Sequence, residues 1–195
     1  MYPRILRSAL SGAALTALLA GTLAAQDVPG RDALWFGLGL GPGIAGVQCT
    51  ICRANRGTAA TGELRLGGRL SSHVLVGVEA TFWAGGVQSG AREAMWGVGP
   101  VGYFFPRAGG GFYWKGGVGY LSWHSTDGQG VLSADALGVI LGTGWEFRVA
   151  RQLTLAPYVS LFAAPLSGSI KFNGAAIQPN VVLVLAQAGI SLTRH

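Results

Sequence analysis

Seven charged residues fall at spacings that would turn their side chains to one face of β-strands. They lie inside short apolar segments, where every second residue of a strand points the same way. Paired carboxylates can perform general acid and base catalysis beside a cleft, whereas carboxylates among basic groups form ion pairs. The seven are Glu63, Arg65, Arg69, Glu79, Lys115, Glu146 and Arg148. We expect an ion-pair network rather than a catalytic pair, with Glu79 and Glu146 as the best acidic partners of the four basic residues.

Cys49-Thr50-Ile51-Cys52 is the only short motif in the sequence. A Cys-x-x-Cys pair can be a redox centre or half a zinc site, but zinc needs further ligands and no second cysteine pair exists. Thioredoxin-type chemistry expects the pair at the start of a helix after a strand. In an exported chain the default is a local disulfide. We therefore predict a Cys49–Cys52 disulfide that stiffens a loop, and no metal or cofactor.

Eight segments alternate apolar residues with small or polar ones, which is the period of a β-strand. In the clearest, residues 137–148, bulky residues take the odd positions, and glycines and charges take most even ones. The segments cover about residues 34–42, 58–70, 74–82, 96–105, 112–123, 137–148, 153–163 and 182–192. We expect loops over residues 124–135 and 165–180.

Two prolines fall inside these segments. Proline cannot donate to a ladder, so Pro100 predicts a bulge or a local loss of pairing, and Pro157 is a second awkward position. The phase of residues 96–105 is ambiguous as a result. We group on one face Trp96, Val98, Val101, Tyr103 and Phe105.

The size of the side chains on each face of the strands distinguishes a membrane barrel from a soluble sandwich. A sandwich hides its bulky row in a core, whereas an outer-membrane barrel turns that row to lipid and its small and polar row inward. The chain is 50% hydrophobic and 11% charged, yet after residue 25 no run approaches the roughly 20 apolar residues of a spanning helix. Its 33 glycines suit a crowded small barrel. A glycine-rich soluble sandwich is the alternative.

The N-terminus has the layout of an export signal. Arg4 and Arg7 form a basic region, an Ala- and Leu-rich stretch follows, and small residues end it at Ala24 and Ala25. We expect cleavage after residue 24 or 25, so residues 1–25 are a signal peptide and residues 26–195 one domain. A retained anchor is less consistent with so short an apolar run.

The charge of the mature chain is modestly positive. Removing Arg4 and Arg7 leaves 12 basic and 8 acidic residues, a formal charge of +4. These basic residues are scattered singly rather than clustered with aromatic residues, so the sequence shows no sign of a nucleic-acid-binding surface. A basic surface suits anionic lipopolysaccharide instead.

With its signal, its alternation and loops that are long after segments one, three, five and seven, the mature chain resembles the small eight-stranded outer-membrane barrels of the OmpA/OmpX type. The resemblance implies an all-β, antiparallel, up-and-down transmembrane barrel in the cell outer membrane, with both termini periplasmic. This group usually ends in an aromatic residue read by the assembly machinery. Here the last residues are Leu192-Thr193-Arg194-His195, so either assembly targeting differs or Leu192 serves as the terminal apolar residue.

The resemblance implies a structural or surface-interaction role without catalysis, because an eight-stranded interior is just wide enough for side chains. We expect the charged network to fill it and the long loops to meet an unidentified ligand. Two alternatives stay open. One is a narrow pore for small solutes. The other is a lipid A-modifying enzyme of the PagL deacylase type, which uses a His and a Ser two positions apart, loosely matched by His124-Ser125-Thr126-Asp127.

Overall fold

The computed structural model describes residues 34–49, 55–85, 91–126 and 130–195. Within these ranges no helix is long and apolar enough to cross a membrane. The described residues form strands β1 (Leu34–Gln48), β2 (Asn55–Arg69), β3 (Val74–Ala84), β4 (Arg92–Phe104), β5 (Phe112–Thr126), β6 (Val131–Trp145), β7 (Phe147–Ala150), β8 (Leu153–Phe172) and β9 (Ala175–Arg194), with short connections between them.

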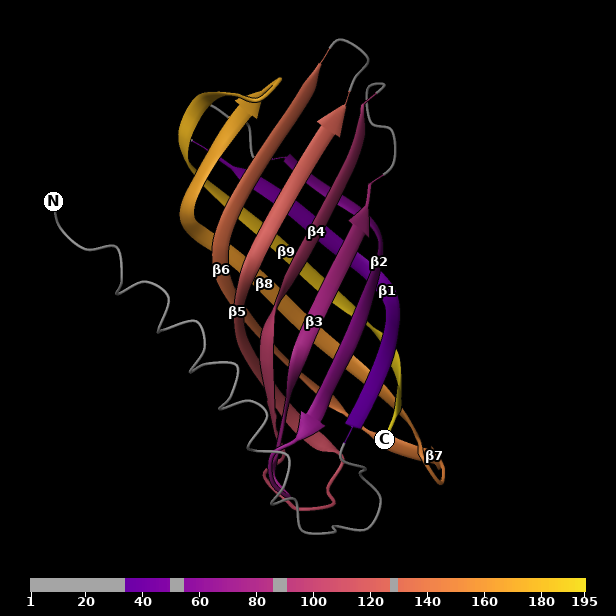
Figure 1. Ribbon diagram of the computed structural model, residues 1–195. Helices are drawn as coiled ribbons and strands as arrows, with labels where there is room; N and C mark the ends of the chain where they lie inside the picture. The colour runs from indigo at the N-terminus through magenta and orange to yellow at the C-terminus, as the bar shows by residue number, and fades with distance from the viewer. Residues whose placement is uncertain (1–33, 50–54, 86–90, 127–129) are drawn as a thin grey trace, which may run out of the picture.

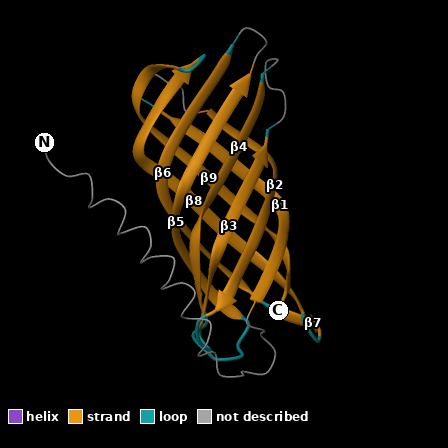
Figure 2. Cartoon of the chain, viewed as in Figure 1, coloured by secondary structure: helices purple, strands orange, loops and turns teal. Residues whose placement is uncertain are grey.

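The strands form one sheet that closes on itself (Figures 1 and 2). Each strand from β1 to β6 pairs antiparallel with the next, β1 also pairs with β9, and β8 joins β9 to β6. Strands β6 and β7 count as one, because both pair with β8 in a continuous register interrupted at Glu146. Pro157 lies opposite this interruption and has no N–H to donate. The fold is a closed eight-stranded antiparallel barrel, as the alternation predicted.

Pro100 causes a local loss of pairing and no bulge. It stays in register with Val78 on β3, while the ladder toward β5 skips Gly99 and Pro100 and resumes unshifted at Val101. Because the register is unbroken, the alternation continues through the proline. The predicted phase was therefore wrong beyond it: Trp96 and Val98 face outward, but the side chains that face inward are Val101, Tyr103 and Phe105.

The predicted loop over residues 165–180 is instead the end of a long hairpin. Strands β8 and β9 each have 20 residues and meet at Asn173 and Gly174, both with positive φ. Gly174 supplies a backbone conformation that glycine adopts without strain. The ladder to β6 extends as far as Phe172, and irregular registers absorb Pro179. Alternation is weak here, so the sequence pattern alone did not reveal the strands.

The two ends of the barrel differ. One end, the short-turn end, carries the connections 70–73, 105–111 and 151–152 and the C-terminus, seen at the bottom of Figure 1. The other, the long-strand end, carries the hairpin turn at Asn173–Gly174. A membrane-spanning strand needs about 9–11 residues. Most strands here have 13 to 20, so the barrel continues beyond a bilayer.

Large apolar side chains cover the outside of the wall. Leu34, Leu66 and Val118 are each more than half exposed. Aromatic residues flank this belt, as in outer-membrane barrels. At the short-turn end they include Phe36, Phe104, Trp114, Trp145 and Phe147, and toward the long-strand end Phe82, Trp96 and Tyr120. This exposed apolar belt, flanked by aromatic residues, is the membrane-facing part of the wall.

Closure between β1 and β9 depends on a backbone contact at Gly41. A Cβ there would lie 2.0 Å from the Ala188 carbonyl oxygen and 2.6 Å from the Gly189 Cα. We expect Gly41→Ala to lower the free energy of unfolding by about 1–3 kcal/mol, because backbone cannot rotate away as a side chain can. Urea unfolding in lipid vesicles, followed by tryptophan fluorescence, measures the loss.

Gly116→Ala is the matched control, since a Cβ at Gly116 has no atom within 4 Å. Equal stability of the two variants would show that β1 and β9 are not held this close.

Candidate functional site: the barrel interior

Four of the seven predicted charged residues meet inside the barrel, toward the short-turn end. Lys115 Nζ lies 2.8 Å from both carboxylate oxygens of Glu79 and 3.6 Å from Glu63 Oε2. Arg65 Nε lies 3.2 Å from Glu63 Oε1. All four side chains are buried. Two acids and two bases therefore neutralise each other in this ion cluster, defined as Glu63, Arg65, Glu79 and Lys115.

Neutral polar groups add hydrogen bonds to the ion cluster. The Tyr103 hydroxyl donates to Glu79 Oε2 at 2.8 Å, and Gln187 Nε2 donates to Glu63 Oε2 at 3.2 Å. Arg65 Nη2 donates to the hydroxyls of Ser191 and Thr193 on β9. These hydrogen bonds offset part of the cost of burying charge, while Glu63 Oε1, Arg65 Nε and Gln187 Oε1 accept or donate no hydrogen bond within the described residues.

Strand register explains why these residues meet. Arg65 pairs directly with Glu79 across β2 and β3, and Lys115 pairs with Tyr103 across β4 and β5. On β1, glycine leaves the space into which Glu63 folds, because a Cβ at Gly39 would lie 2.6 Å from Glu63 Cγ. An inward glycine on one strand thus makes room for an inward charged side chain from the next.

The other three predicted residues lie nearer the short-turn end. Arg69 is buried there. Glu146 is partly buried, with Oε2 3.7 Å from His195 Nε2. Arg148 is exposed on β7, although it pairs with the inward-facing Thr154. The contacts of the ion cluster thus join four of the seven residues, and the seven-residue network stays a prediction.

Sequence reasoning missed several members of the arrangement. Gln187 and Ser191 belong to the predicted strand over residues 182–192, but they carry no charge, so nothing marked them. Tyr103 was assigned to the opposite face through the ambiguous phase at Pro100. His195 is buried at the end of β9.

The interior toward the long-strand end is apolar, which corrects the expectation of a polar network throughout. Phe162 is 2% exposed and packs over Gly97 and Gly119, where a Cβ would lie within 3 Å of its ring. The neighbouring inward strand ends contribute other large side chains. Among them are Trp83, Met95, Leu121, Trp123, Leu183 and Leu185, all buried. We call this set, with Phe162, the apolar stack.

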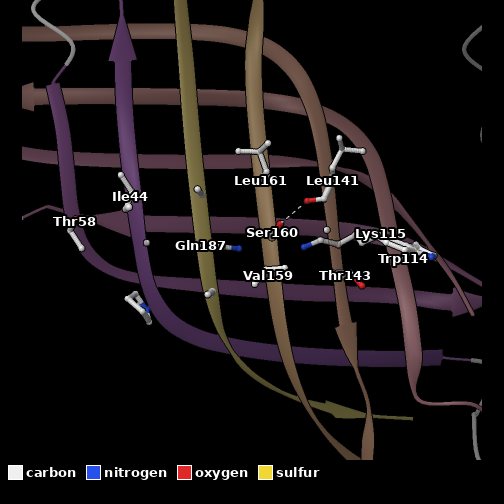
Figure 3. A pocket seen from close by; sticks show the side chains of 15 residues that line it. Ile44, Thr58, Trp114, Lys115, Leu141, Thr143, Val159, Ser160, Leu161 and Gln187 are labelled. Carbon is white, nitrogen blue, oxygen red and sulfur yellow. Dashed lines mark hydrogen bonds between the residues drawn. The ribbon is translucent and has the colours of Figure 1, made fainter.

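A groove of about 720 Å³ hollows the outer wall beside the ion cluster (Figure 3). Its sides are outward apolar residues such as Ile44, Leu141 and Val159, and inward-facing Lys115 and Gln187 reach its floor where glycines thin the wall. Ser160 Oγ donates to the Leu141 carbonyl within it at 3.5 Å. The lining is apolar and lies in the membrane-facing belt, so it suits an acyl chain better than a polar solute.

The residues of the deacylase-like match point in different directions. His124 is exposed on the outer face of β5, whereas Ser125 belongs to the opposite face, and Asp127 lies outside the described residues. Ser122 and Thr126 share the face of His124. The Ser122 hydroxyl is buried and donates to Asp135 Oδ1 at 2.8 Å, so it is engaged with a carboxylate rather than with His124.

Two further predictions fall on residues without a described placement. Cys49 lies just after β1, but Cys52 is outside the described residues. The same holds for the predicted signal peptide, residues 1–25. Both stay predictions.

No protein-family model and no curated protein matches the sequence. Solved structures do match it in shape. Neisserial surface protein A (NspA) superposes with a TM-score of 0.58 at 10% identity, covering 84% of this chain and 97% of that one. OprG from Pseudomonas aeruginosa gives 0.51 at 15% identity, covering 87% and 100%. AlkL gives 0.51 at 12% identity, covering 86% and 93%.

Similarity at these identities establishes the fold. A closed barrel satisfies every backbone group of its wall without water, which is what a bilayer demands of a strand-built protein. The chain has the fold of the small eight-stranded outer-membrane β-barrels of the OmpA/OmpX type, and with its apolar belt this places it in the outer membrane, as the sequence predicted.

Proposed function

We propose that this protein has a structural or surface-interaction role in the outer membrane and that its interior is closed to ions. The observation that carries the proposal is the way the interior is filled. A charge-balanced ion cluster lies toward the short-turn end, beside buried aromatic side chains such as Trp35 and Tyr113, and the apolar stack fills the long-strand end. An ion crossing the barrel would have to break the first and then pass the second without water.

Size supports the same conclusion. An eight-stranded barrel is about as wide as the side chains that fill it, and wider barrels are needed for an aqueous channel. The apolar stack adds an energetic barrier, because transferring an ion into apolar surroundings costs many kcal/mol.

The unequal ends support an orientation. In outer-membrane barrels the short turns face the periplasm and the longer connections face outward. On this basis the β8–β9 hairpin projects from the cell, and a Cys49–Cys52 disulfide would stiffen a neighbouring outer loop. The expected partners are outer-membrane lipid and lipopolysaccharide, the assembly machinery during insertion, and a ligand of the outer segments.

Planar-bilayer recording tests the closed interior. The folded protein is expected to give no discrete conductance steps above the bare-bilayer background, at either polarity. Heat-modifiability on a gel confirms that the sample added to the bilayer is folded. Reproducible single-channel steps from folded protein would contradict the proposal and favour the narrow-pore alternative.

A further inference from the structure

The outer wall changes from apolar to polar within one row of residues near the long-strand end. Cross-strand pairing places Val98, Tyr120, Leu137 and Leu166 in one row across β4, β5, β6 and β8. The next row toward the long-strand end is Trp96, Ser122, Asp135 and Ser169. The row after that is Ala94, His124, Ser133 and Lys171.

This change marks the edge of the apolar belt. Leu137 and Leu166 are more than half exposed, as lipid-facing residues are. Trp96 and Tyr120 stand at the transition with ring centroids 5.6 Å apart. Aromatic side chains of this kind sit at the level of lipid headgroups. The polar rows therefore lie beside the headgroups rather than the acyl chains.

Together with Arg92 in the row beyond them, the polar rows carry two cationic side chains and one carboxylate. Lys171 Nζ lies 3.1 Å from Asp135 Oδ2, and both side chains remain partly exposed. Asp135 also accepts hydrogen bonds from Tyr120 and Ser122, so three groups share its charge. Arg92, exposed opposite Thr126 at the edge of the same surface, and His124 add basic character. We call this surface, with Arg92, Thr126, His124, Ser133, Asp135, Ser169 and Lys171, the headgroup patch.

We propose that the headgroup patch binds the phosphorylated sugar headgroup of an outer-leaflet glycolipid of the lipopolysaccharide type. Lys171 and Arg92 would contact phosphate, and the hydroxyl and imidazole groups between them would contact sugar. The inference rests on the orientation given under the proposed function, since only the long-strand end would meet that leaflet.

The extent of the headgroup patch favours a sugar over a simple phospholipid. It spans four adjacent strands, which is about 14 Å from the first strand to the last. Thr126 and Ser133 lie on β5 and β6, the two strands between Arg92 and Lys171, and Ser169 lies beside Lys171 on β8. A saccharide carrying phosphate matches this layout, whereas a phospholipid headgroup would reach one end of it.

The test uses the full mature barrel in detergent, titrated with bis-phosphorylated lipid A and read by native mass spectrometry. The Arg92→Gln/Lys171→Gln variant is expected to raise the dissociation constant about tenfold. Arg107→Gln/Arg151→Gln, which removes the same charge at exposed positions of the short-turn end, should leave it unchanged. Asp135→Asn should lower it, because Lys171 then loses its competing carboxylate.

Three results would overturn the proposal. The first is an equal rise of the dissociation constant in both double variants. The second is that dephosphorylated lipid A binds as tightly as bis-phosphorylated lipid A. The third is that phosphatidylglycerol binds as tightly as bis-phosphorylated lipid A, which would indicate a general phosphate contact. Heat-modifiability establishes that each variant is folded. Channel activity of a wild-type protein that still binds lipid A through the headgroup patch would overturn the closed interior alone, so the two proposals fail separately.

Discussion

Lys115→Met is expected to lower the free energy of unfolding by about 3–5 kcal/mol, the loss typical of removing one partner of a buried ion pair. Lys115 donates to both oxygens of Glu79 and also faces Glu63. Methionine has a similar length but no charge, so the variant leaves the two acids with Arg65 as the remaining base of the ion cluster. Urea unfolding in vesicles, followed by tryptophan fluorescence, measures the change.

Two further variants separate charge from packing. Arg148→Met removes an exposed base and should change stability by no more than about 0.5 kcal/mol. Adding Glu79→Gln to Lys115→Met should restore part of the lost stability, since it removes the carboxylate left without its partner. If Lys115→Met alone were as stable as the wild type, the ion cluster would not be holding the interior together.

Phe162→Ala is expected to cost about 3–5 kcal/mol, the range for deleting a buried aromatic ring. Phe162 comes from β8 and fills the space above Gly97 and Gly119 on β4 and β5, so its loss leaves a cavity between facing walls. The glycines cannot fill that cavity. The same unfolding measurement applies, and the variant should also lose part of its heat-modifiable band shift.

Val159→Ala provides the comparison on the same strand. Val159 is 52% exposed on the outer face, where lipid replaces the lost methyl groups, and its removal should cost about 1 kcal/mol or less. Similar losses at both positions would mean that the apolar stack does not pack as tightly as its burial indicates.

Local pattern was enough to predict the wall of the barrel. Residues 137–148 alternate so regularly that their strand and their outward face follow directly, and the same holds for β1 and the inner part of β9. Strand limits were predicted less well. Residues 165–180 lack clear alternation, and they are strands because β6 supplies partners for β8 there. A single sequence does not contain that information.

The sequence predicted that charged side chains point into the barrel, but not which of them contact each other. Alternation predicted that Glu63, Arg65 and Lys115 point inward. It did not predict which acidic side chain each basic side chain contacts. That choice follows from the stagger of the strands, which sets which residues share a level of the barrel. Arg148 shows the limit, because an inward phase near a barrel end still leaves a side chain in solvent.

The sequence by itself determined the period of the strands, the apolar outer face and the presence of inward charges, because these depend on the alternation of neighbouring residues. Tertiary structure decided the phase beyond Pro100, the ion cluster, the apolar stack and the headgroup patch. The phase follows from the unbroken register of β4 with β3, and the other three join residues from three or more strands, which only barrel closure and register bring together.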